Sequence, residues 1–168
     1  MNNDRSTTLG FGTYALMLSV ILWGVMAGGG IYAAMVYFPA YLSHLPESAV
    51  VVTGPYGLNE GIFWLSIHPL LILSLIISLI SNWRFPPRRK LITLTFAVYV
   101  VVLIITQLYF LPELFAFARS SQSSLTSDEW QMRTNRWQLL NIVRGVVIFA
   151  NFFPLLFALT RTRNNVGE

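Results

Sequence analysis

The sequence predicts an all-α membrane protein: a bundle of four transmembrane helices with both termini in the cytoplasm. The chain of 168 residues is 55% hydrophobic and only 11% charged, which is more apolar surface than a soluble domain of this length can bury. Four apolar segments each reach the roughly 20 residues that the hydrocarbon core requires. We therefore treat residues 1–168 as a single transmembrane domain.

The predicted spans are residues 14–41, 62–80, 91–111 and 139–160. The first resembles a signal peptide because Arg5 precedes it, but its apolar character continues to Leu42, which is too long for a signal sequence. We interpret it as a retained helix. Between the second and third spans, Pro86 and Pro87 stop the helix within a short connection, so these spans are expected to be antiparallel neighbours.

Lys and Arg residues mark one side of the predicted bundle. That side carries Arg5, Arg84, Arg88, Arg89, Lys90, Arg161 and Arg163. The loop over residues 43–61 has no Lys or Arg, and the loop over 112–138 has three arginines balanced by three acidic residues. The first side is therefore predicted to be cytoplasmic, and the net charge of +4 reflects topology rather than a nucleic-acid surface. We expect a multi-pass protein of the bacterial inner membrane, with the lipid bilayer as its partner.

The two outer loops carry local signals of their own. Residues 50–52 are β-branched and residues 54–57 are turn formers, so we expect an extended stretch followed by a turn. Ser127, followed by Asp128 and Glu129, is typical of a helix N-cap with an acidic first turn. This pattern predicts a short amphipathic helix leading into the fourth span.

The first span is rich in small residues, including the pair Gly24 and Gly28 four residues apart. Small residues let helix backbones approach closely in lipid. We expect this face to pack within the bundle. The alternatives are a homodimer face or a contact with a partner in a membrane complex.

Arg144 is the most informative residue, because a charge inside a span is costly unless it is paired. It lies about 10 Å below the outer end of the fourth span, and a carboxylate on the second or third span is expected to pair with it. The sequence thus predicts an outward-facing polar pocket in which Arg144 pairs with Glu60 or Glu113 and is oriented by Gln107 and Asn141. The structural alternative is an ion pair that only fixes helix register. The candidate binding residues are Glu60, Trp64, His68, Gln107, Tyr109, Glu113, Trp137, Asn141 and Arg144.

No cofactor is identified by the sequence. His68, Glu60 and Glu113 would supply one imidazole and two carboxylates, but no Glu-x-x-His or His-x-x-x-His pair is present, so we predict no metal site. The chain has no cysteine, which excludes thiolate metal sites and disulfides. It also lacks a phosphate-binding loop, a dinucleotide fingerprint and a nucleophile elbow.

Three segments together resemble the anthrone-oxygenase-like family of small four-helix membrane proteins. These are the run over residues 28–40, the Thr106 to Glu113 end of the third span, and Trp137-x-x-x-Asn141-x-x-Arg144. The resemblance implies a four-helix membrane fold and, from the fungal members, oxidation of polycyclic anthrones. Members often carry a histidine at the position of Asn141.

Two functions from different classes follow. The first is a small integral membrane protein that binds a small apolar or aromatic molecule in the polar pocket, or that serves as an accessory subunit of a membrane complex. The second is an oxygenase-like membrane enzyme in which His68 and Arg144, the catalytic candidates, polarise or deprotonate a phenol or enol. We favour the first because no complete catalytic constellation is visible, and whether the protein is an enzyme stays open.

Overall fold

The computed structural model describes residues 10–161, and every regular element in this range is a helix. In chain order the elements are α1 (Phe11–Tyr32), η1 (Ala33–Tyr37), α2 (Phe38–Leu42), η2 (Glu47–Ala49), α3 (Val50–Thr53), α4 (Gly61–Ser81), α5 (Pro86–Ile105), η3 (Thr106–Phe110), α6 (Leu111–Ala118), η4 (Ser120–Gln122), α7 (Ser127–Ala150) and α8 (Phe152–Thr160). Several of these join end to end. By length and composition, four of the resulting continuous helices can cross a membrane: Phe11–Leu42, Gly61–Ser81, Pro86–Ala118 and Ser127–Thr160.

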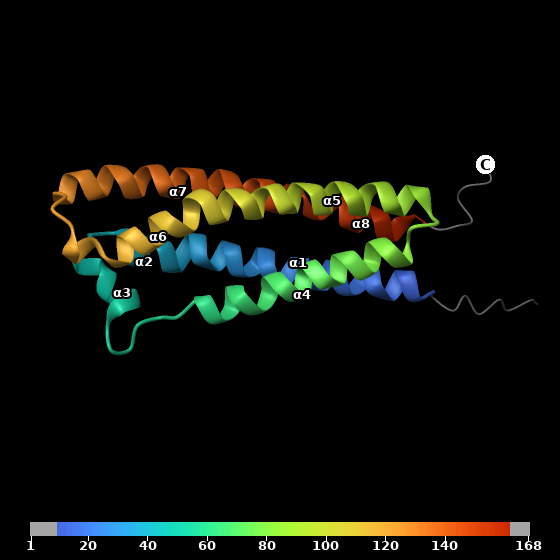
Figure 1. Ribbon diagram of the computed structural model, residues 1–168, viewed down its shortest axis with the longest axis horizontal. Coiled ribbons are helices and arrows are strands. Elements are labelled where there is room, and N and C mark those ends of the chain that lie inside the picture. Colours follow the sequence, from blue (N-terminus) through green and yellow to red (C-terminus); the bar gives the residue numbers. More distant parts are fainter. Residues whose placement is uncertain (1–9, 162–168) are drawn as a thin grey trace, which may run out of the picture.

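The long helices lie side by side in an elongated bundle (Figure 1). The first, α1, packs against α4 and α8, and α5 packs against α8. The predicted contact between the second and third spans is present, because α4 and α5 also touch. We call the end with the α4–α5 connection the connection end, and the end with α2, α3, α6 and the start of α7 the loop end (Figure 1).

The third helix is longer than the predicted span of residues 91–111, because a helix does not stop where its residues become polar. The predicted lead-in to the fourth span is present and is continuous with that span. A capping box starts the fourth helix: Thr126 Oγ1 accepts a bond from the Glu129 amide at 3.3 Å, and Glu129 Oε2 accepts one from the Thr126 amide at 2.8 Å. The cap is therefore Thr126, one residue before the predicted Ser127. The 34-residue helix is about 51 Å long, so it extends well beyond a hydrocarbon core of about 30 Å.

Two π-helical turns interrupt the long helices, and each is followed by a proline. In η1 the amide of Phe38 bonds the carbonyl of Ala33, and in η3 the amide of Leu111 bonds that of Thr106, both five residues back. Pro39 and Pro112 follow directly. Since a proline has no N–H and crowds the carbonyl four residues before it, the wider π turn lets each helix continue.

One loop prediction was wrong. Residues 50–52 were expected to be extended, but Val50–Thr53 form the short helix α3. Val51 and Val52 pack against the aromatic cluster at the loop end, and this tertiary contact outweighs β-propensity. The predicted turn is present, because the Gly57 amide bonds the Gly54 carbonyl at 2.9 Å.

The core has two parts. At the loop end it is mainly aromatic, with Tyr37, Phe38, Tyr41, Phe110, Phe117, Trp130 and Trp137. The other part includes Leu16, Trp23, Met26, Leu71, Leu75, Ile92, Tyr99 and Leu155. Trp64 packs against both clusters.

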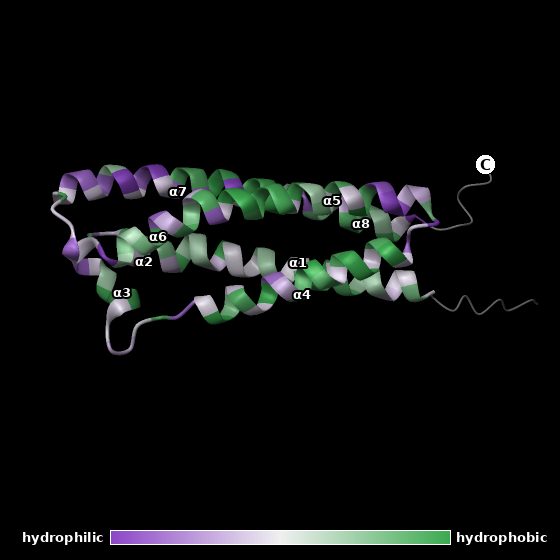
Figure 2. Ribbon diagram, viewed as in Figure 1, coloured by the Kyte–Doolittle hydropathy of each residue, from purple (hydrophilic) through white to green (hydrophobic). Residues whose placement is uncertain are grey.

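Apolar side chains also cover the outside of the bundle. Leu65, Ile21 and Val146 are each more than 60% exposed. Figure 2 shows hydrophobic residues along the middle of the long helices and hydrophilic residues toward their ends, most densely on the first part of α7. A soluble monomer rarely exposes such a continuous apolar surface. The surface and the four apolar helices indicate a multi-pass membrane protein.

The glycines of the first helix do not all face the bundle. A Cβ atom added at Gly29 would lie 2.5 Å from Cε1 of Phe63 on α4, so the Phe63 ring would have to shift to admit it. A Cβ atom at Gly24 would make an ordinary contact with Phe152 at 3.9 Å. Gly28 is exposed, with open space where its Cβ atom would lie. The expected tight packing within the chain is therefore carried by Gly29 and not by Gly28.

Candidate functional site

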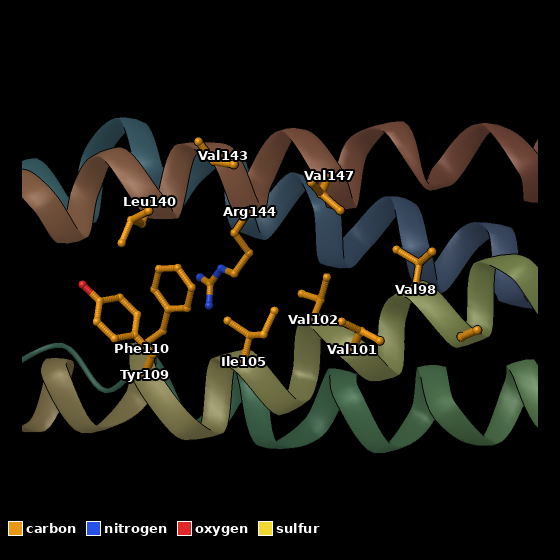
Figure 3. Close-up of a pocket in the computed structure, with 11 residues that line it drawn as sticks. Val98, Val101, Val102, Ile105, Tyr109, Phe110, Leu140, Val143, Arg144 and Val147 are labelled. Carbon is orange, nitrogen blue, oxygen red and sulfur yellow. The ribbon is translucent and has the colours of Figure 1, made fainter.

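Arg144 lies on α7, half-buried, and directs its guanidinium toward η3 (Figure 3). Its Nη2 donates to Oδ1 of Asn141 at 2.6 Å, and its Nη1 donates to Oγ1 of Thr106 at 3.1 Å. Asn141 was predicted to orient Arg144, and it does so from three residues earlier on the same helix. Both acceptors are neutral.

The π turn η3 supplies the other contacts of Arg144. Thr106 is its first residue and Phe110 its last. The Arg144 Cζ atom lies 4.3 Å from the centroid of the Phe110 ring, close enough for a cation–π interaction. The Thr106 hydroxyl donates its own proton to the Val102 carbonyl at 2.8 Å, which leaves its oxygen free to accept from Arg144.

The predicted ion pair of Arg144 with Glu60 or Glu113 is wrong. Glu113 instead accepts two bonds from Arg133, at 2.6 Å from Nε and 2.8 Å from Nη2. This is the one salt bridge among residues 10–161. Arg144 lies eleven residues beyond Arg133, about 16 Å farther along α7, and so cannot share this carboxylate.

Glu60 has a different partner. Its Oε2 accepts a bond from the indole N–H of Trp64 at 3.1 Å. Glu60 precedes the first residue of α4, and burial raises the pKa of its carboxyl, while the bond from Trp64 acts in the opposite direction.

Gln107 does not orient Arg144. It is exposed, and no side-chain hydrogen bond to it is present among the described residues. The π turn is the reason, since it presents Thr106 and Phe110 to α7 and leaves Gln107 on another face. The neighbouring Tyr109 is half-buried and does reach the site.

A cavity of about 500 Å³, open along the outside of the bundle, lies between α5, η3 and α7 (Figure 3). Its lining residues are Ala97, Val98, Val101, Val102, Ile105, Tyr109, Phe110, Leu140, Val143, Arg144 and Val147. Arg144 is the charged residue of this set, and Tyr109 adds a hydroxyl. The volume falls within the range of small-molecule sites, roughly 300–1,000 Å³. The arrangement can therefore hold an apolar body beside one cationic group.

His68 belongs to a separate cluster. Its Nδ1 lies 2.6 Å from the hydroxyl oxygen of Tyr99, and the Trp64 ring stacks on it at 5.6 Å between centroids. Tyr99 is buried and also packs against Trp23. None of these four residues lines the cavity. His68 faces the bundle interior as expected, and its hydrogen-bond partner is Tyr99 rather than a residue that lines the cavity.

Trp137 is a core residue. It is buried among Phe38, Phe110 and Phe117, and its indole N–H donates to the Phe110 carbonyl at 3.2 Å. It thereby holds the last residue of η3 against α7, which positions the Phe110 ring near Arg144.

Phe110 and Tyr99 were absent from the predicted site, and Thr106 was expected at its level but was not among the candidate binding residues. A signal for two of them was present, because Thr95, Tyr99, Val102 and Thr106 recur at spacings of three and four and form one face of the third span. The contact of Phe110 depends on the π turn, which α-helical spacing does not describe.

In the described part of the chain, no three His, Asp or Glu side chains are grouped to hold a metal ion. Comparison of the chain with protein-family models, curated proteins and solved structures gave no match. The resemblance to anthrone-oxygenase-like proteins thus rests on the sequence motifs alone.

Proposed function

We propose that this protein is a multi-pass membrane protein that binds a small apolar or aromatic molecule between α5 and α7. The observation that carries the proposal is the cavity of about 500 Å³, apolar except for Arg144 and Tyr109. Apolar walls hold an apolar body by van der Waals packing, and one or two fixed polar groups supply orientation. An oxygen-bearing group on the ligand would be bound by Arg144.

We further propose that the connection end is cytoplasmic, because Arg84, Arg88, Arg89 and Lys90 are gathered there. Arg144 then lies in the outer half of the bundle, about five residues below Leu139, where the apolar part of the fourth span begins. A ligand would enter sideways from the bilayer, since Val101 and Val143 of the lining are each more than 50% exposed.

An oxygenase activity is not favoured by the site geometry. The residue best suited to proton transfer, His68, is engaged by Tyr99 and Trp64 and does not line the cavity. A binding function that involves no reaction needs only the residues that line the cavity. A partner for the first helix stays a prediction, for which exposed Gly28 offers a face.

Native mass spectrometry of the purified protein tests the binding proposal. The Val101→Trp variant fills the cavity, and Val146→Trp is its matched control because Val146 is exposed on α7 outside the lining. We expect a co-purifying small molecule on the wild type and on Val146→Trp, and its loss from Val101→Trp. Equal occupancy of all three proteins, or none on the wild type after incubation with membrane extract, would contradict the proposal.

A further inference from the structure

We infer that the ligand of this cavity is a single-chain amphiphile with a carboxylate head, such as a fatty acid, and that Arg144 binds the head. The inference rests on the proposed function, because it names the ligand class of the same cavity.

The charge of Arg144 is the first argument. A guanidinium has five N–H donors, and Arg144 directs two of them to the neutral oxygens of Thr106 and Asn141. Within residues 10–161 the one salt bridge joins Arg133 to Glu113, so no described carboxylate neutralises Arg144. A cation in apolar surroundings is stabilised most by an anion that can accept two parallel N–H bonds, as a carboxylate does.

The shape of the cavity is the second argument. From the level of Arg144, the apolar lining continues along α5 from Ile105 to Ala97. The eight-residue separation corresponds to about 12 Å along the helix axis. Val147 on α7 faces the same stretch, so the wall beyond the guanidinium is purely aliphatic. An extended hydrocarbon chain fits along this aliphatic wall, with its charged head at the end where Arg144 lies.

The depth of Arg144 decides between head groups. The residue lies about 7 to 8 Å below Leu139, counted along the helix. The phosphate of a two-chain phospholipid stays in the headgroup region of the bilayer, outside this level. A carboxylate on a single chain is small enough to descend to it, which favours a fatty acid over a phospholipid.

The test is equilibrium binding of tritiated palmitate and tritiated hexadecanol to the protein in phosphatidylcholine nanodiscs, with empty nanodiscs subtracted. The two ligands share the same chain length and differ in head charge. We expect the wild type to bind palmitate at least tenfold more tightly than hexadecanol. Arg144→Lys should keep a preference for palmitate, and Arg144→Met should lose it while hexadecanol binding is unchanged.

Two results would contradict the carboxylate head, and a third would contradict the cavity as the binding site. Equal affinity for palmitate and hexadecanol, or saturable binding of neither, would overturn the carboxylate assignment and leave the proposed function to the mass-spectrometry result. Unchanged binding of both ligands by Val101→Trp would show that they bind elsewhere, which removes the cavity itself as the site. If Arg144→Met does not fold, the wild-type comparison of the two ligands and the Val101→Trp variant still decide the question.

Discussion

The imidazole of His68 and the phenol of Tyr99 join α4 to α5 through a distance of 2.6 Å between Nδ1 and Oη. The pair is flanked by two tryptophans, since Trp64 stacks on His68 and Trp23 packs on Tyr99. Tyr99 is buried, so its hydroxyl has little access to another partner. This pair is a polar link between the second and third spans.

Replacing Tyr99 with Phe should therefore destabilise the protein by about 1 kcal/mol, the typical net contribution of one buried hydrogen bond. Thermal unfolding in detergent measures the change. Tyr32→Phe is the control, because Tyr32 is 56% exposed on the outside of the bundle. A double-mutant cycle with His68→Leu should show a coupling energy of similar size. Purely additive effects would mean that the short contact does not contribute to stability.

Arg88 joins three separate segments at the connection end. It donates from Nε to the Arg161 carbonyl at 2.9 Å, and from Nη1 to Thr13 Oγ1 at 2.8 Å and Asn82 Oδ1 at 3.3 Å. Arg88→Met should cost about 2–3 kcal/mol, because bonds to a buried charged group are lost together. Arg84→Met removes the same charge from an exposed position in the same connection and should be nearly neutral. Equal unfolding temperatures for the two variants would show that Arg88 contributes only a positive charge that sets the orientation in the membrane.

Gly28 and Gly29 are adjacent but face different surroundings. Gly29→Leu should destabilise the bundle by up to about 1 kcal/mol, since its side chain would displace the Phe63 ring. Gly28→Leu should leave the stability of the monomer unchanged, because its side chain would enter open space. Thermal unfolding compares the two variants. If Gly28→Leu lowers the apparent molecular mass in size-exclusion chromatography, a second chain covers this face.

Glu60 should make stability depend on pH. Its folded-state pKa is raised by burial, so the native state holds the proton more tightly than the unfolded state. The stabilising contribution of the protonated form is full below the unfolded pKa and is lost as the pH rises through the folded pKa. The Glu60→Gln variant should thus gain stability relative to the wild type as the pH rises above the ordinary Glu pKa of about 4.3.

Orientation in the membrane is tested by cysteine labelling, for which the natural absence of cysteine is an advantage. A membrane-impermeant maleimide added from outside should label Ser121→Cys at the loop end and not Lys90→Cys at the connection end. Both positions are exposed, so accessibility depends on the side of the membrane alone. Labelling of Lys90→Cys and protection of Ser121→Cys would reverse the proposed topology.

The helical content and the four apolar helices could be predicted because hydrophobic length is a local property. Within the site, Asn141 was found as a partner of Arg144 because both lie on one α-helix, where spacing fixes neighbours. The partner of Glu113 was not found, because Arg133 lies outside the apolar run and was not expected to face α6. Contacts between helices depend on their relative rotation, which spacing within one helix does not determine.

The π turn before Pro112 has a consequence for how sequences of this kind are compared. Its additional residue advances the angular phase of the following helix by about 100° relative to α5. A helical wheel drawn continuously over Pro86–Ala118 therefore misplaces Glu113 and Phe117, which contact Arg133 and Trp137 of α7. Loss of one residue between Thr106 and Phe110 during evolution would leave the hydrophobic profile intact and yet turn Glu113 away from Arg133. Alignments that allow no gap inside a transmembrane segment would hide this change.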